Sequence, residues 1–113
     1  MKRILIFLLI LSLFGCAAYK REMGRNNRNI AKLEIGISQD SVVAIMGKPR
    51  LKEAYEQDDG SIITVLFYYT NRVWADGNAT RDEMTPICIK NNRLVGWGQD
   101  YYTTNIKIIS EGK

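Results

Sequence analysis

The residues from Ser61 to Val73 constrain the fold of this chain more than any others. Most of them are β-branched, aromatic or aliphatic, which is typical of a β-strand: Ile62, Ile63, Val65, Leu66, Phe67, Tyr68 and Tyr69. The run is apolar on both of its faces, which predicts a central strand. We expect one face to lie on a helix and the other to be partly covered.

A short helix is predicted before this strand. Ser38 is its expected N-cap, and Asp40 in the first turn complements the helix dipole. Gly47 can adopt the left-handed conformation that ends a helix, and Pro49 prevents continuation. Apolar residues recur at helical spacing between these signals, at Val42, Val43, Ile45 and Met46.

Weaker signals predict the neighbouring strands. Residues 50–56 are a modest strand candidate, and Asp59-Gly60 is the sharpest turn signal. Residues 85–90 and 93–97 flank Asn91-Asn92, which suits a two-residue hairpin because Asn tolerates positive φ. In the expected register, Cys88 faces Val95 and Ile89 faces Leu94.

The predicted fold class is α+β, with one or two short N-terminal helices packed on a three- to four-stranded antiparallel sheet. The globular domain is expected over residues 33–109, with a tail at 110–113. Ile106, Ile108 and Ile109 indicate a last short strand, and Tyr101 and Tyr102 are expected to pack back on the domain.

Residues 1–15 have the features of a secretory signal peptide. Lys2 and Arg3 precede an apolar run of 11 residues, Ile4–Phe14, which is too short for a membrane-spanning helix of about 20 residues. The run closes on Leu13-Phe14-Gly15-Cys16, which resembles the lipobox of bacterial lipoproteins. The resemblance implies that Leu13 and Gly15 are recognised by the processing machinery and that Cys16 is acylated. An ordinary signal with a chance Gly-Cys pair, or an uncleaved anchor, is the alternative.

Removal of the signal changes the charge of the chain. The formal net charge is +4, but Lys2 and Arg3 leave with the signal, so 14 of the 16 basic groups remain against 12 acidic ones. The excess lies in residues 16–32, which we expect to form a lipidated basic tether. Its side chains are expected to contact anionic headgroups, chiefly Lys20, Arg21, Arg25 and Arg28. A merely solvated linker is the alternative, and nucleic acid is not an expected partner.

The composition excludes several kinds of chemistry. The chain has no histidine, so Ser-His-Asp and Cys-His catalysis and His-ligated zinc are impossible. Cys88 is the one cysteine left after lipidation and is expected to be buried. Asp76, Asn78, Thr80 and Asp82 alternate like calcium ligands, but Arg81 and Ile87 stand where an EF-hand loop needs Gly and Glu. We therefore expect no metal, no cofactor and no catalytic residues.

Two segments are similar to families of small lipoproteins. Residues Leu33–Pro49 resemble the L-x-x-G-M-[ST]-x-x-x-V-x-x-[LM]-[LM]-G-x-P segment of the SmpA/OmlA (BamE-like) outer-membrane lipoproteins, and Phe67-Tyr68-Tyr69 matches the aromatic strand that follows it there. Residues 66–98 look more like a related family of short lipoproteins of unknown function. The resemblance implies two helices on a three-stranded sheet, like a repeat of the β-lactamase inhibitor protein. It also implies a non-enzymatic envelope role.

The expected function is that of a lipid-anchored envelope protein that binds another protein or supports outer-membrane assembly or maintenance. Ala17, which is not aspartate, favours the periplasmic face of the outer membrane over the inner membrane, by resemblance to enterobacterial sorting. The alternatives are an inhibitor-like module that docks on a periplasmic enzyme and, less favoured, a carboxylate-based hydrolase. The candidate partner-binding residues lie in or near the 74–84 loop: Trp74, Asp76, Arg81, Asp82, Glu83 and Trp97.

Overall fold

The computed structural model of the protein describes residues 18, 20–71 and 81–107. A helix covers residues 20–30. It is followed along the chain by α2 (Gln39–Met46), β1 (Leu51–Glu56), β2 (Ile62–Tyr69), η1 (Arg81–Glu83), β3 (Met84–Lys90), β4 (Arg93–Trp97), α3 (Gln99–Tyr102) and the π-helical turn η2 (Thr103–Lys107).

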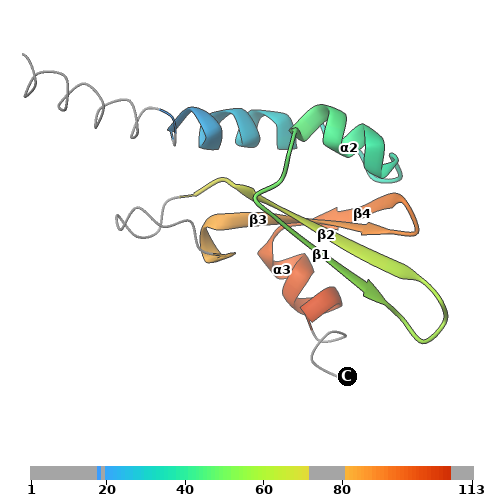
Figure 1. Ribbon diagram of the computed structural model, residues 1–113. Helices are drawn as coiled ribbons and strands as arrows, with labels where there is room; N and C mark the ends of the chain where they lie inside the picture. Colours follow the sequence, from blue (N-terminus) through green and yellow to red (C-terminus); the bar gives the residue numbers. More distant parts are fainter. Residues whose placement is uncertain (1–17, 19, 72–80, 108–113) are drawn as a thin grey trace, which may run out of the picture.

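The four strands form one antiparallel sheet in the order β1-β2-β3-β4. The helix of residues 20–30 and α2 lie over one face of this sheet, and α3 lies under the other (Figure 1). The predicted α+β fold class is therefore confirmed. The second helical layer, formed by α3, was not predicted from the sequence.

Helix α2 begins and ends at the expected residues. The Ser38 hydroxyl accepts a hydrogen bond from the Ser41 N–H at 3.2 Å, and Gly47 has a φ of 81° where the chain leaves the helix. Val42 and Met46, four residues apart, are the buried side chains of α2. They pack on the sheet, and this packing stabilises a helix too short to persist alone.

Strand β2 divides the core in two, as its apolar pattern predicts. Leu66 and Tyr68 pack under the helix of residues 20–30 and α2, whereas Val65 and Phe67 pack against α3. Successive side chains of a strand point to opposite faces, so an all-apolar strand needs cover on both sides. The ring of Tyr102 in α3 meets Phe67 edge-on, with 5.5 Å between centroids.

The prediction of a last short strand is wrong at Ile106. Residues Thr103–Lys107 form a π-helical turn, and Ile106 is buried with the α3-side core. Ile108 and Ile109 lie outside the described residues. The physical reason is that the face of β2 holding Val65 and Phe67 would otherwise meet water, so the chain crosses beneath the sheet.

The hairpin between β3 and β4 differs from the expected register at one position. Asn91 and Asn92 have φ values of 49° and 68°, as predicted, and Ile89 faces Leu94. Cys88, however, faces Gly96 and not Val95, because a β-bulge shifts the register between Cys88 and Ile89. Its thiol is fully buried, as expected.

At Gly96 the ring of Tyr101 in α3 lies directly against the backbone of the sheet. A Cβ added there would lie 2.7 Å from two ring atoms of Tyr101. We expect Gly96→Ala to lower the free energy of unfolding by roughly 1–3 kcal/mol, because α3 must move off the sheet. Urea unfolding measures this change. In a Tyr101→Ala background the same substitution should cost much less, and an equal cost in both backgrounds would contradict the contact.

Candidate functional site

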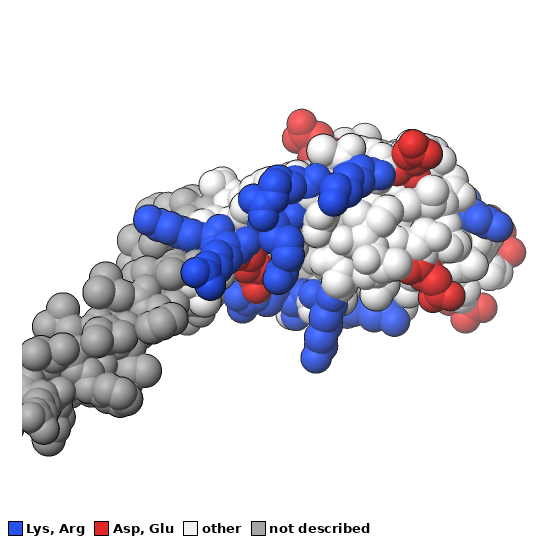
Figure 2. All heavy atoms as spheres, turned by 90° about the horizontal axis from the view of Figure 1, so that it is seen from above, with Lys and Arg blue, Asp and Glu red and all other residues white. Residues whose placement is uncertain are grey.

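The helix of residues 20–30 carries a row of cations on its outer side. Arg21, Arg25 and Arg28 follow one another at intervals of four and three residues, which places them on one helix face, and Lys32 continues the series in the turn beyond. We call these four residues the basic stripe. All four are exposed, as is Lys20 beside them. Seen from above the helices, Lys and Arg side chains gather where residues 20–30 enter the domain (Figure 2).

The opposite side of this helix is fixed to the sheet. Asn26 is 3% exposed, and its Nδ2 donates to the Tyr69 carbonyl at 2.9 Å. Asn27 Nδ2 donates to the Thr70 carbonyl, also at 2.9 Å. Ile30, four residues after Asn26, packs against the core under α2. Residues 20–30 therefore form part of the folded domain and hold the basic stripe in a fixed orientation.

This arrangement differs from the tether expected over residues 16–32. The sequence shows little apolar periodicity there, because the helix docks through asparagine amides that donate to backbone carbonyls at the end of β2. The one sequence feature that could have indicated a docked helix is the four-residue spacing of Asn26 and Ile30. Lys20, Arg21, Arg25 and Arg28, the residues expected to contact headgroups, are all exposed.

An ion pair and a ring contact add to the docking. Arg50, between α2 and β1, forms an ion pair with Glu22, with 2.8 Å between Nη2 and Oε2. The Arg50 guanidinium also lies 5.5 Å from the centroid of the Tyr69 ring. The pair joins residues 28 positions apart in sequence, so no local pattern predicts it. It is partly exposed and contributes modestly to stability.

The expected partner-binding residues do not form one surface within the described chain. Trp74 and Asp76 lie outside the described residues, Arg81 begins η1, and Asp82 is exposed. Glu83 is 0% exposed, so its side chain does not lie on the surface where a partner was expected to bind. Trp97 is half-buried and packs against the core under α2, which makes it largely a core residue.

Glu83 instead closes the base of the segment between β2 and η1. Its carbonyl accepts hydrogen bonds from the N–H groups of Thr70, at 3.1 Å, and Asn71, at 3.0 Å. The Glu83 side chain is buried because its backbone, just before β3, lies against the residues that follow β2. Asn71 and Glu83 are thereby held together, beside the end of the sheet where Asn26 and Asn27 dock.

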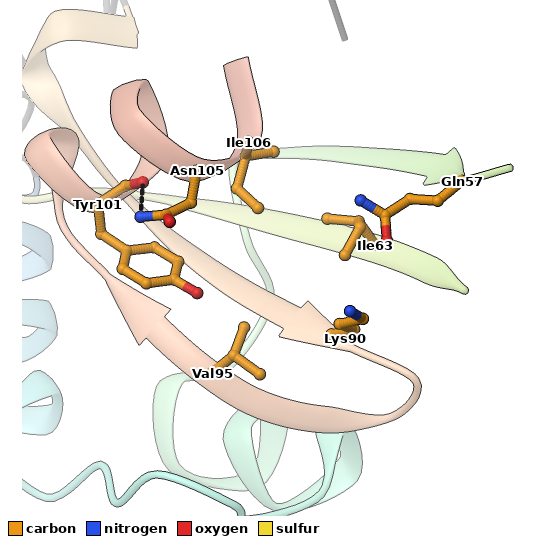
Figure 3. Close-up of a pocket in the computed structure, with 7 residues that line it drawn as sticks. All are labelled: Gln57, Ile63, Lys90, Val95, Tyr101, Asn105 and Ile106. Carbon is orange, nitrogen blue, oxygen red and sulfur yellow. Dashed lines mark hydrogen bonds between the residues drawn. The ribbon is translucent and has the colours of Figure 1, made fainter. Parts of the chain in front are cut away.

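A pocket of about 190 Å³ opens on the α3 side of the sheet (Figure 3). Its apolar lining comes from Ile63, Val95 and Ile106, and its polar lining from Gln57, Lys90, Tyr101 and Asn105. Asn105 Nδ2 donates to the Tyr101 carbonyl at 3.0 Å, which fixes one wall. This lining suits a small apolar group with a polar or anionic end, and it contains neither a carboxylate nor a thiol.

A family model described as a protein of unknown function (DUF3192) matches residues 16–104. The chain belongs to the DUF3192 family. The matched region starts at Cys16 and contains the helix of residues 20–30, α2, the whole sheet and α3. Searches among curated proteins and among solved structures found no match to the chain.

Two further findings concern the described part of this DUF3192 member. No helix within it is long and apolar enough to cross a membrane. No group of three or more Cys, Asp and Glu side chains within it is arranged to hold a metal ion. The features that stand out in the described chain are the basic stripe, the hydrogen bonds that join Thr70 and Asn71 to Glu83, and the pocket beneath the sheet.

Proposed function

We propose that this DUF3192 protein is an envelope lipoprotein, acylated at Cys16, that holds its helix of residues 20–30 on an anionic membrane surface. The observation that carries the proposal is the orientation of the basic stripe. Arg21, Arg25 and Arg28 point away from the sheet, while the docking of Asn26 prevents the helix from rotating. Each basic residue near an anionic lipid surface contributes about 1 kcal/mol of binding.

The sequence before the helix supports the same orientation. The lipobox-like Leu13-Phe14-Gly15-Cys16 ends four residues before Lys20, so an acyl chain on Cys16 and the basic stripe reach the same surface. The periplasmic face of the outer membrane is the proposed location, because Ala17 follows the cysteine.

We propose a binding role for the rest of the domain, in the assembly or maintenance of the outer membrane. The support is the long connection between β2 and η1, whose ends are held by the Glu83 carbonyl. Long connections with fixed ends on a rigid sheet are typical of binding loops. Asp82, exposed at the end of this connection, is a suitable site for a photocrosslinking side chain. The proposed kinship with the SmpA/OmlA lipoproteins rests on residues Leu33–Pro49 and agrees with this role.

Acylation is tested with the full chain in a bacterial host that has an outer membrane, grown with labelled palmitate. We expect the unchanged chain and a Cys88→Ala control to incorporate the label and to stay with membranes after a high-salt wash. Cys16→Ser should incorporate none, because acylation needs the thiol. If Cys16→Ser is still cut to the mature size and still resists the salt wash, the lipoprotein proposal is wrong.

A further inference from the structure

The sheet has one outer edge whose backbone groups point into solvent. Gln57 N–H bonds the Ser61 carbonyl at 2.8 Å, and these residues continue the β1–β2 register. Backbone groups of an antiparallel strand alternate between its two sides. The N–H and C=O groups of Lys52 and Ala54 therefore point away from β2, and within the described residues they have no backbone partner on that side.

The opposite edge of the sheet, along β4, is already occupied. Gly36 N–H bonds the Leu94 carbonyl, and Leu94 N–H bonds the Ile37 carbonyl, both at 2.8 Å. Ser38 adds an isolated bridge to Arg93. A further strand has room at β1 and not at the middle of β4, so any addition to this sheet takes place at β1.

The sequence of β1 is complementary to itself when read in the opposite direction. Lys52, Ala54 and Glu56 alternate along the strand and are all exposed. If Ala54 lies opposite Ala54 of a second copy, Lys52 of each copy lies opposite Glu56 of the other. Opposite charges on facing strands stabilise a pair, and like charges destabilise it. Sliding one copy by two residues breaks both Lys–Glu pairs and, in one direction, sets Glu53 opposite Glu53.

We propose that the protein binds a second copy of itself through β1, joining two sheets into one continuous antiparallel sheet with Ala54 at its centre. The contact is isologous, so it closes as a dimer and does not propagate into a fibre. The inference goes beyond the proposed membrane role and does not depend on the lipid.

The symmetry of this dimer suits attachment to a surface. Two strands that pair antiparallel in one sheet are related by a two-fold axis perpendicular to that sheet, which keeps the helices of both copies on the same face. Because α2 and the helix of residues 20–30 lie on one face of the sheet (Figure 1), the two basic stripes point in the same direction. A short strand pairing buries little area, and two copies held on one surface meet at a high effective concentration.

Disulfide trapping of the full chain tests the pairing. Facing residues of a hydrogen-bonded pair have Cα atoms about 5.5 Å apart, a separation that disulfides favour. We expect Ala54→Cys to give a disulfide-linked homodimer after mild oxidation of broken cells, in whichever fraction holds the protein. Lys52→Cys is the matched control, because two copies of residue 52 would be roughly 14 Å apart. It should give no homodimer above that of the unchanged chain.

Charge exchange gives a second, independent readout in the Ala54→Cys chain. Lys52→Glu should abolish the homodimer by setting two carboxylates opposite each other, and Lys52→Glu combined with Glu56→Lys should restore it. The proposal is overturned if Ala54→Cys gives no homodimer, if Lys52→Cys crosslinks equally well, or if Ala54→Cys is captured only by a different protein. Failure of the lipid test with success here would leave the dimer standing.

Discussion

Replacement of Arg21, Arg25 and Arg28 by Gln is expected to weaken binding to anionic phospholipid vesicles by about 3 kcal/mol, which is a factor on the order of 100. The chain lacking residues 1–16 is used, so that the acyl chain does not contribute. The reason is that the three arginines lie on one exposed helix face, so a membrane placed against that face would contact all three. Gln has nearly the helix propensity of Arg, so the helix of residues 20–30 is retained. Vesicle sedimentation over a series of lipid concentrations measures the affinity.

The matched control removes the same charge elsewhere. Lys48, Lys90 and Arg93 are exposed but belong to other parts of the surface. Replacing these three by Gln should change the vesicle affinity much less than the stripe variant does. The binding of the unchanged chain should also fall steeply with added salt, and that of the stripe variant should not. Equal losses in the two triple variants would mean that net charge, and not the orientation of the helix, governs the binding.

The architecture was largely predictable because the strongest signals in this sequence are local. The apolar run around Val65 requires a central strand whatever the rest of the chain does. Ser38 and Gly47 fix the ends of α2 through their own hydrogen bond and dihedral angle. The Asn91-Asn92 turn follows from the tolerance of asparagine for positive φ. In each case the physical cause lies within a few residues of its effect.

The features that escaped prediction all depend on contacts distant in sequence. Asn26 bonds a carbonyl 43 residues away, and a polar residue gives no apolar periodicity to detect. Glu83 is buried although carboxylates are rarely fully buried. The π-helical turn at Ile106 depends on the face of β2 that holds Val65 and Phe67, which Ile106 helps to cover. The basic residues were identified from the sequence, but the docking that aligns them was not.

The two sides of the domain consequently have different roles in the proposals. The helix of residues 20–30 and α2 cover one side and present cations to a surface. The α3 side holds the pocket beside Lys90 and the second half of the core. If the basic stripe rests on a membrane, the α3 side faces away from it, and the pocket is open to soluble ligands and partners. The proposed β1 pairing preserves this division, because both copies keep the same side toward the membrane.

The domain is expected to lose stability steeply in alkaline solution, by on the order of 4 kcal/mol between about pH 8 and pH 11. Burial raises the pKa of the Cys88 thiol to about 12 and that of the Tyr68 phenol to about 12. Both groups therefore stay protonated in the folded chain, while the unfolded chain releases the thiol proton above about pH 9 and the phenol proton above about pH 10. The unfolded state binds fewer protons in this window, so the free energy of unfolding falls as the pH rises.

The Cys88→Ala chain separates the thiol from the phenol. Cys88→Ala is expected to be less stable than the unchanged chain at every pH, because a buried side chain is shortened. The two chains are therefore compared by how much the free energy of unfolding changes with pH. Between about pH 8 and pH 10 the unchanged chain should lose more than 1 kcal/mol of stability, and Cys88→Ala should lose clearly less, because only buried phenols such as Tyr68 then contribute. The Tyr68 phenol donates to the Gly47 carbonyl at 2.8 Å, so its contribution persists in both chains above that range. Urea unfolding at each pH measures the free energy, and alkylation of Cys88 should follow global unfolding. A thiol that reacts at the rate of an exposed cysteine in the folded chain would contradict its burial against the α3 side of the sheet.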